Sequence, residues 1–255
     1  MNLHALYKNA MQRGKPDSVS FLTKWITKVL GNKSVIILQI GSNDGKTRDP
    51  IFDLISKNKK WRGIFVEPVP YLFERLKKNY LSLGHPDRFL FFNGAVNEGI
   101  NQDFYFVDEH AKYVISNLPE WYDQIGSFNK EHIITHMDGI LEPFIKSIKI
   151  TGITLPALMS NFALSQVDLL HVDTEGYDWK ILCQLDLGKY QPTIILYEHK
   201  HLKNTEIASS IDHLSDKYEL FRFKNDFICF HRQKHFLTPK DLKFLRKNYP
   251  KNSYS

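Results

Sequence analysis

One short segment constrains the fold of this chain more than any other. Residues 35–40, Val-Ile-Ile-Leu-Gln-Ile, form an apolar run rich in β-branched side chains. The run ends in Gly41-Ser-Asn-Asp-Gly45, a turn bordered by two glycines. Continuous apolar runs of this length are typical of strands buried on both faces, and such strands occur in parallel sheets covered by helices. We therefore predict a central buried strand that opens into a tight turn.

The same pattern repeats along the chain, with helical periodicity between the apolar runs. Alternation of strands and helices indicates a parallel sheet with crossover helices, and two closing runs joined at Lys224-Asn225 indicate a hairpin. We predict an α/β, doubly wound, Rossmann-like fold with a mixed, mostly parallel sheet and a terminal hairpin. Further predicted strands are 63–67, 89–92, 102–107, 167–173, 193–198, 218–223 and 226–231, and predicted helices begin at Asp49-Pro50, at Pro70, after Gly176 and near 205.

Composition shifts divide the chain into three parts. Residues 1–34 form an N-terminal segment with an amphipathic helix that starts at Ser18 or Ser20 and ends at Gly31. Residues 35–237 form the main domain, in which 111–150 are an irregular, aromatic and polar insertion. Residues 238–255 form a basic tail, whose helix we expect to be an accessory surface rather than part of the core.

Charge and composition narrow the classes of partner. The net charge is +6, but the basic excess lies mainly in the tail, so the body has no basic stripe of the kind that binds nucleic acid. No apolar run is long enough to span a membrane, and the first residues lack the apolar core of a signal peptide. Two distant cysteines favour a reducing compartment. We expect a cytoplasmic protein that does not bind nucleic acid.

The ends of the predicted strands indicate a nucleoside-type cofactor. In open α/β sheets, ligands bind beyond the carboxyl ends of the strands. Glu67 ends the second strand about 20 residues after the glycine turn, the usual place for a carboxylate that accepts the hydroxyls of a ribose. The turn lacks the middle glycine of dinucleotide folds, and Asp44 would repel phosphates but tolerate an amino group and a sulfonium. These features favour S-adenosylmethionine. The expected cofactor residues are Gly41, Ser42, Asn43, Asp44, Gly45, Glu67, Pro68, Ala95 and Asp173.

Several of these segments resemble the FkbM family of methyltransferases. The resemblance covers roughly residues 35–200 and rests on the segments 38–45, 66–70, 124–128, 168–178 and 196–199. It implies a class I methyltransferase fold and O-methylation of sugars or secondary metabolites. Many such enzymes have an acidic residue two positions before the first glycine. This chain has Gln39 there, so that cofactor contact is weaker or different.

Acidic residues at the ends of two later strands are the catalytic candidates. Asp173 and Glu198 end neighbouring strands, and Glu175 follows Asp173 on the turn into a helix. Asp173 with Glu198 could hold a hard divalent cation or, without metal, orient a substrate hydroxyl. His199 is the expected general base. Asp178 serves equally well as a helix cap, and His171 is expected in the core.

The sequence leaves the acceptor open. We expect the insertion to cover the site with Trp121, Tyr122, Gln124 and Ser127, since aromatic faces suit sugar rings and also ordinary cores. The predicted function is S-adenosylmethionine-dependent O-methylation of a hydroxyl on a sugar, a glycan or a small metabolite. Two alternatives remain: a Rossmann-type oxidoreductase that binds a nucleotide cofactor, and a nucleic acid methyltransferase. The second would be supported by an Asp/Asn-Pro-Pro-aromatic segment, which is typical of amino-group methylation, but the chain contains none.

Overall fold

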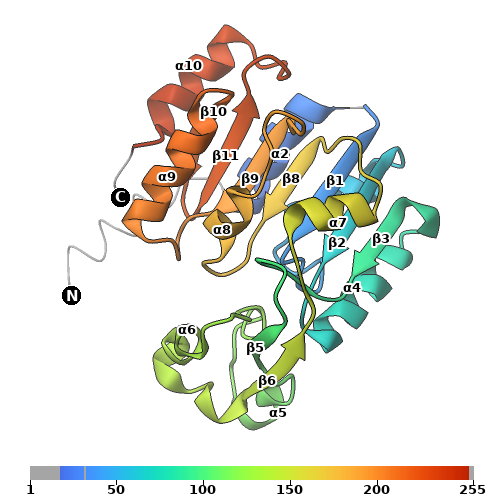
Figure 1. Ribbon diagram of the computed structural model, residues 1–255, viewed down its shortest axis with the longest axis vertical. Helices are drawn as coiled ribbons and strands as arrows, with labels where there is room; N and C mark the ends of the chain where they lie inside the picture. The colour runs from blue at the N-terminus through green and yellow to red at the C-terminus, as the bar shows by residue number, and fades with distance from the viewer. Residues whose placement is uncertain (1–17, 32, 253–255) are drawn as a thin grey trace.

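The computed structural model describes residues 18–31 and 33–252. Its centre is a seven-stranded sheet with the order β10-β11-β9-β8-β1-β2-β3 (Figure 1). All neighbouring strands are parallel except for the pairs that include β11. The predicted α/β, mostly parallel fold with a terminal hairpin is therefore confirmed. The strands are β1 (Val35–Ile40), β2 (Trp61–Val66), β3 (Phe89–Phe92), β8 (Leu169–Val172), β9 (Ile194–Glu198), β10 (Tyr218–Phe223) and β11 (Asp226–His231).

Helices cover both faces of this sheet. One face packs against α2 (Ser18–Leu30), α3 (Phe52–Lys57), α4 (Pro70–Leu81) and α10 (Pro239–Asn248). The other packs against α7 (Leu155–Asn161), α8 (Asp178–Leu182) and α9 (Asn204–Ser215). Successive strand side chains point to opposite faces, so β1 sends Ile37 into one core and Leu38 into the other. Within the described residues, no helix combines the length and the apolar character needed to cross a membrane.

A lobe with its own small core projects from this body, at the bottom of Figure 1. Its frame is the antiparallel pair β5 (Gln102–Val107) and β6 (Ile145–Ile150), which form a separate sheet. Between them lie the short helices α5 (Ala111–Val114), α6 (Lys130–Ile134), η2 (His136–Gly139) and η3 (Glu142–Phe144). The expected irregular insertion over 111–150 is thus corrected. Residues 145–150 form a strand, because they pair with 102–107. A short parallel pair, β4 (Ala95–Val96) and β7 (Gly152–Ile153), joins the lobe to the body.

Two local features differ from the sequence-based expectations. Helix α3 begins at Phe52 rather than at Pro50, although the Asp49 carboxylate accepts the backbone N–H groups of Ile51 and Phe52, as expected of a capping residue. Helix α7 was not predicted, although Thr154 caps it by accepting the N–H of Ala157. A threonine cap shortly before a proline is a recognisable start signal.

The C-terminal helix is part of the core rather than an accessory surface. Leu245 is fully buried, and Phe244 packs on Trp25 of α2 with ring centroids 6.2 Å apart. Lys28 of α2 forms an ion pair with Asp241. The apolar edge of the tail therefore holds it against the N-terminal helix. Residues 1–17 and 253–255, parts of the predicted terminal segments, lie outside the described residues.

The turn after β1 lies in direct contact with the end of β8. Gly41 has a φ of +79°, and a Cβ atom placed there would lie 1.8 Å from the backbone carbonyl oxygen of Asp173. Backbone atoms in a buried sheet cannot move aside for a methyl group. Gly41 therefore allows two loops of the carboxyl edge to approach more closely than any other residue would permit.

We predict that Gly41→Ala lowers the free energy of unfolding by about 2–5 kcal/mol, because a left-handed backbone and an overpacked contact both oppose the methyl group. Gly84→Ala is the matched control, since Gly84 has a φ of +74° with no atom within 4 Å of the added Cβ. The control should lose only about 1–2 kcal/mol. Urea unfolding of both variants measures the difference, and equal losses would show that the contact with Asp173 is not responsible.

Candidate active site

Two adjoining cavities lie at the carboxyl edge of the sheet. The first is bounded by the loops after β1, β2, β3 and β8 and by one wall of the lobe. Apolar side chains form most of this wall, and Glu67 is one of few acids on it. Its lining residues are Ile40, Gly41, Asn43, Val66, Glu67, Pro68, Val69, Gly94, Ala95, Val96, Phe104, Gln124, Gly126, Phe128, Asp173, Thr174, Glu175 and Tyr177.

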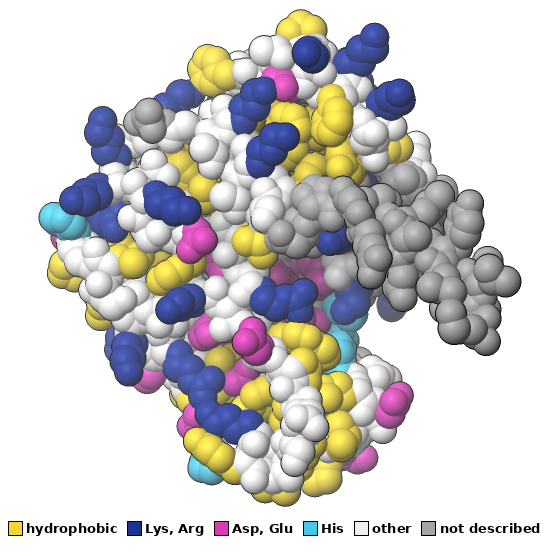
Figure 2. All heavy atoms as spheres, turned by 180° about the vertical axis from the view of Figure 1, so that it is seen from behind, with side chains coloured by type: hydrophobic (Ala, Val, Ile, Leu, Met, Phe, Trp, Pro, Cys, Tyr) yellow, Lys and Arg dark blue, Asp and Glu magenta, His cyan; other side chains and the backbone are white. Residues whose placement is uncertain are grey.

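The second cavity is larger and more polar, with a volume of about 340 Å³. Figure 2 shows acidic and histidine side chains gathered in the hollow between the lobe and the body. Polar lining residues include Gln39, Arg48, Asp49, His136, His171, Glu198, Lys200, Asn225 and Asp226. The two cavities meet at Gly41, Asn43, Gln124, Asp173 and Glu175, which line both of them.

Glu67 is placed where the sequence predicts it, at the end of β2 and on the wall of the first cavity. Its oxygens accept the backbone N–H groups of Asn43 and Val69, each at 2.8 Å. Burial raises the pKa of this carboxyl to about 7. Each oxygen has a second lone pair, so the carboxylate can still accept hydrogen bonds from a ligand.

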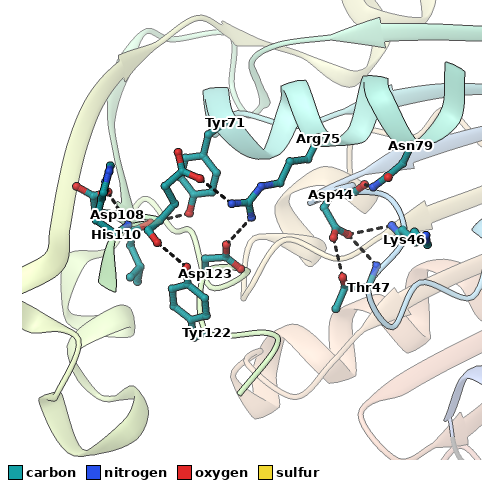
Figure 3. Close-up of polar contacts among 12 residues, drawn as sticks. Asp44, Lys46, Thr47, Tyr71, Arg75, Asn79, Asp108, His110, Tyr122 and Asp123 are labelled. Atoms are coloured by element: carbon teal, nitrogen blue, oxygen red, sulfur yellow. Dashed lines mark hydrogen bonds and ion pairs between the residues drawn. The ribbon is translucent and has the colours of Figure 1, made fainter. Parts of the chain in front are cut away.

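The turn after β1 divides its predicted residues between cavity and scaffold. Gly41 and Asn43 line both cavities, and Ser42 lines the second. Asp44 lines neither, because its carboxylate accepts the N–H groups of Lys46 and Thr47 and the Thr47 hydroxyl within its own loop (Figure 3). Gly45 also lies away from the cavities.

The scaffold role of Gly45 follows from its neighbours. An added Cβ there would meet Leu76 and Tyr80 of α4. Pro68 and Ala95, in contrast, line the first cavity as expected. The structure thus brings most of the predicted cofactor residues to one place, while two residues of the turn serve the fold.

Gln39 belongs to the second cavity rather than to the first. Its side-chain amide donates to the Asp49 carboxylate at 2.6 Å and lies 3.1 Å from Nδ1 of His171. Burial lowers the pKa of His171 to about 4, so this ring is neutral. The Gln39 amide therefore links Asp49 and His171 behind the turn. A carboxylate at position 39 would be repelled by Asp49.

Three predicted catalytic carboxylates converge between the cavities. Oxygens of Asp173, Glu175 and Glu198 lie within 4.8 Å of one another. Burial and the neighbouring acids raise the pKa values of Asp173 and Glu198, and Asp226 adds to this repulsion. Such a group can share protons or hold a hard cation. Asp178 holds the loop after β8 against the end of β9. It is fully buried and accepts hydrogen bonds from Thr174 and from the N–H of Glu198.

The structure separates His199 from the other catalytic candidates. Its Nε2 accepts a hydrogen bond from Nε of Arg222 at 3.0 Å, and its ring packs on Phe227. Burial, followed by the charge of Arg222, lowers the pKa of His199 to about 4. His199 lines neither cavity. The expectation that it serves as the general base is therefore corrected, because its lone pair already accepts a hydrogen bond from a guanidinium.

The lobe contributes only part of the predicted substrate set. Trp121 and Gln124 line the second cavity. Tyr122 does not, because its hydroxyl donates to the carbonyl of Glu109 (Figure 3). Ser127 is buried and pairs through its backbone with Tyr105.

Helix α4 holds the lobe in place. Arg75 forms ion pairs with Asp123 at 3.0 Å and Glu109 at 2.7 Å, and the Tyr71 hydroxyl donates to the carbonyl of Val107 (Figure 3). These contacts set the position of the lobe over the carboxyl edge.

Several lining residues had no role in the sequence analysis. Phe104 faces the first cavity, while Lys200 and Asp226 face the second. His136 lines the second cavity, and it forms a cluster with His132, His201 and Glu175. The four-residue spacing of His132 and His136 was visible in the sequence, but their partners are distant in the chain.

Comparisons with known proteins agree with this geometry at the level of the family. Residues 39–226 match the family model described as the methyltransferase FkbM domain. No curated protein matches the chain significantly. A precorrin-6y C5,15-methyltransferase from Geobacter metallireducens GS-15 is a remote structural match, with 8% identity, 85% of this chain and 87% of that chain covered, and a TM-score of 0.44. An RNA methyltransferase from Salinibacter ruber in complex with S-adenosyl-L-homocysteine has 11% identity, 89% and 99% coverage, and a TM-score of 0.42.

The sheet order and the paired cavities at its carboxyl edge define an open α/β fold, a class of proteins in which ligands bind at the strand ends. The family match covers most of the chain and includes the turn after β1, the end of β2 and the segment 173–178. The chain belongs to the FkbM methyltransferase family.

The acids of the site predict a pH-dependent stability. Burial raises the pKa of Asp226 from 3.8 to about 7, so the native carboxyl keeps its proton over a range in which the unfolded chain has lost it. Stability from this group is complete below pH 3.8 and declines as pH rises to about 7. Asp226→Asn should therefore raise the free energy of unfolding at pH 8, by about 1–4 kcal/mol.

At pH 4 the same substitution should change the stability little, because the native carboxyl is already neutral there. Urea unfolding at both pH values provides the measurement. An equal effect of Asp226→Asn at pH 4 and pH 8 would contradict the electrostatic explanation and indicate a packing change.

Proposed function

We propose that this protein is an S-adenosylmethionine-dependent O-methyltransferase that acts on a hydroxyl of a sugar, a glycan or a small metabolite. The observation that carries the proposal is the junction of the two cavities. A cofactor in the first and an acceptor in the second would meet beside Asp173 and Glu175, which line both. Methyl transfer requires this in-line approach of donor and acceptor, and positioning supplies most of the rate increase.

The first cavity fits a nucleoside with an amino acid end. Glu67 would accept the ribose hydroxyls, and the backbone of Gly41–Asn43 would lie along the amino acid part. Phe104 and Phe128 offer apolar faces to an adenine. The enclosed space is small, about 40 Å³. Binding therefore requires side chains on the lobe wall, such as Gln124 and Phe128, to turn aside and close on the cofactor.

We predict that Glu67→Ala weakens binding of both S-adenosylmethionine and S-adenosylhomocysteine at least about tenfold, since each charge-assisted hydrogen bond is worth about 1.5–3 kcal/mol. Calorimetry measures both affinities. Equal losses are expected because the two ligands share the ribose. Glu74→Ala, which removes an exposed carboxylate from α4, is the matched control.

Loss of fold must be separated from loss of contact, because Glu67 also accepts two backbone N–H groups. Thermal unfolding of Glu67→Ala without ligand provides that check. Unchanged affinity in a folded Glu67→Ala variant would refute the placement of the ribose.

The second cavity fits an acceptor with several hydroxyl groups. Its wall offers amide groups and charged groups of both signs. Arg48, Lys200 and Asn225 are among them. Trp121 adds an aromatic face of the kind on which sugar rings pack. A cavity lined in this way favours a polar, hydroxyl-bearing acceptor over an apolar one, because polar groups need partners when water is displaced.

The acids between the cavities would act on the acceptor hydroxyl. When bound, S-adenosylmethionine supplies a methyl group from its sulfonium, and the rest of the cofactor leaves as a neutral thioether. Asp173 and Glu198 repel each other when both are ionised, so a single shared proton is the favoured state. The ionised member accepts the proton of the acceptor hydroxyl, and the protonated member donates to the same oxygen and holds it in line. Glu175 supports this pair from the adjoining turn.

We predict that Asp173→Asn and Glu198→Gln each lower turnover by about 10²–10⁴-fold, the range expected for loss of a positioned proton acceptor. Affinity for S-adenosylmethionine should change much less, because Glu67 and the turn after β1 remain. Glu142→Gln, an exposed substitution on the lobe, serves as the control. Turnover follows from the methyl gain of candidate acceptors in mass spectrometry. Near-normal turnover in both variants would place the chemistry elsewhere, in the lobe.

A further inference from the structure

Three histidines outside the proposed methyl-transfer chemistry converge with Glu175 where the lobe meets the body. The four residues are His132 of α6, His136 of η2, Glu175 from the loop after β8, and His201 from the loop after β9. One nitrogen or oxygen atom of each lies within 4.8 Å of those of the other three. The three imidazole ring centroids are 4.6–5.6 Å apart.

A backbone hydrogen bond determines which nitrogen of His136 is free. Nδ1 of His136 lies 2.7 Å from the backbone carbonyl of His132, so it carries the proton and Nε2 of His136 has a free lone pair. A backbone carbonyl behind one ring nitrogen is the usual arrangement for a histidine that binds a metal through the other.

The remaining two rings compete for a single carboxylate oxygen. Nε2 of His132 lies 3.0 Å from Oε2 of Glu175, and Nε2 of His201 lies 3.2 Å from the same atom. Yet Nε2 of His201 is buried and makes no hydrogen bond of acceptable geometry with the described residues. A buried polar atom without a partner is destabilising, and a ligand that accepts electron pairs would satisfy all of these atoms at once.

We propose that His132, His136, His201 and Glu175 form a binding site for one transition-metal ion of the zinc type. Three imidazole nitrogens and one carboxylate oxygen are a common ligand set for such ions, whereas calcium and magnesium prefer oxygen ligands only. In a tetrahedral zinc site, ligand atoms are about 3.4 Å apart. Closing the site from its present separations needs shifts of about 1 Å, within reach of side-chain rotation.

The ion would join the lobe to the body. Two ligands come from the lobe, and two come from loops at the carboxyl ends of β8 and β9. The ion pairs of Arg75 hold the lobe at α4, and the metal would hold it at the loops after β8 and β9. This site is distinct from the oxygen-only group of Asp173, Glu175 and Glu198, although Glu175 belongs to both. The proposal does not depend on the acceptor or on methyl transfer.

The test is titration of the untagged, metal-free full-length chain with Zn²⁺ and, in parallel, with Co²⁺. We expect one ion per chain, visible d–d absorption of Co²⁺ typical of nitrogen and oxygen ligands in low coordination, and a higher Tm with Zn²⁺. His136→Ala should weaken Zn²⁺ binding by more than about tenfold, since loss of even an outer partner of a ligand lowers affinity about 10–100-fold.

Two further variants make the outcome decisive. His110→Ala removes an exposed histidine from the same lobe and should leave Zn²⁺ affinity unchanged. Asp173→Asn should also leave it nearly unchanged, because Asp173 is not a ligand in the proposed set. Unaltered Zn²⁺ binding by His136→Ala, its loss in Asp173→Asn, or no binding of Zn²⁺ by the wild-type chain would each overturn the proposal. The Tm of each metal-free variant confirms that it is folded.

Discussion

The arrangement of this protein depends on the meeting of parallel strands at one edge. Because β1, β2, β8 and β9 run in the same direction, their carboxyl ends deliver the turn at Gly41, Glu67, Asp173 and Glu198 to one small region. The approach of Gly41 to the carbonyl of Asp173 brings the two central loops together. Glu67 and Asp178 are buried at this edge, and Asp173 and Glu198 are half-buried. Burial of an acid is favourable only when hydrogen bonds, protons or cations compensate for lost water.

The carboxylates at this edge compensate for lost water in different ways. Glu67 and Asp178 accept backbone N–H groups from the loops that they hold. Asp173 and Glu198 face each other with raised pKa values, and Oε2 of Glu198 is buried without a hydrogen-bond partner among the described residues. The pKa values of such uncompensated acids change strongly when a ligand enters the cavity. Perturbed pKa values of this kind are more typical of catalytic groups than of structural ones.

The sequence predicts the sheet well, because its signals are local. The hairpin strands 218–223 and 226–231 have the bounds that the structure shows, since alternation and a turn define them without reference to the rest of the chain. The positions of Glu67 and Asp173 follow from the rule that strand ends carry function. The orientation of Asp44 and His199 could not be predicted in this way. Asp44 is bound by its own loop, and His199 by Arg222, whose approach depends on the pairing of β9 with β11 and of β11 with β10.

The structure of the lobe also could not be predicted from local sequence signals. Its frame depends on pairing between 102–107 and 145–150, which no short window of sequence reveals. That pairing decides which of its polar residues reach the site: Gln124 lines both cavities, whereas Tyr122, two positions earlier, is held by Glu109. The lobe has a core of its own, and it also packs on the start of α4 through a separate apolar cluster that includes Leu72, Phe104 and Phe106. The body thus fixes the part of the site nearest the strand ends, and the lobe determines the shape and polarity of the rest.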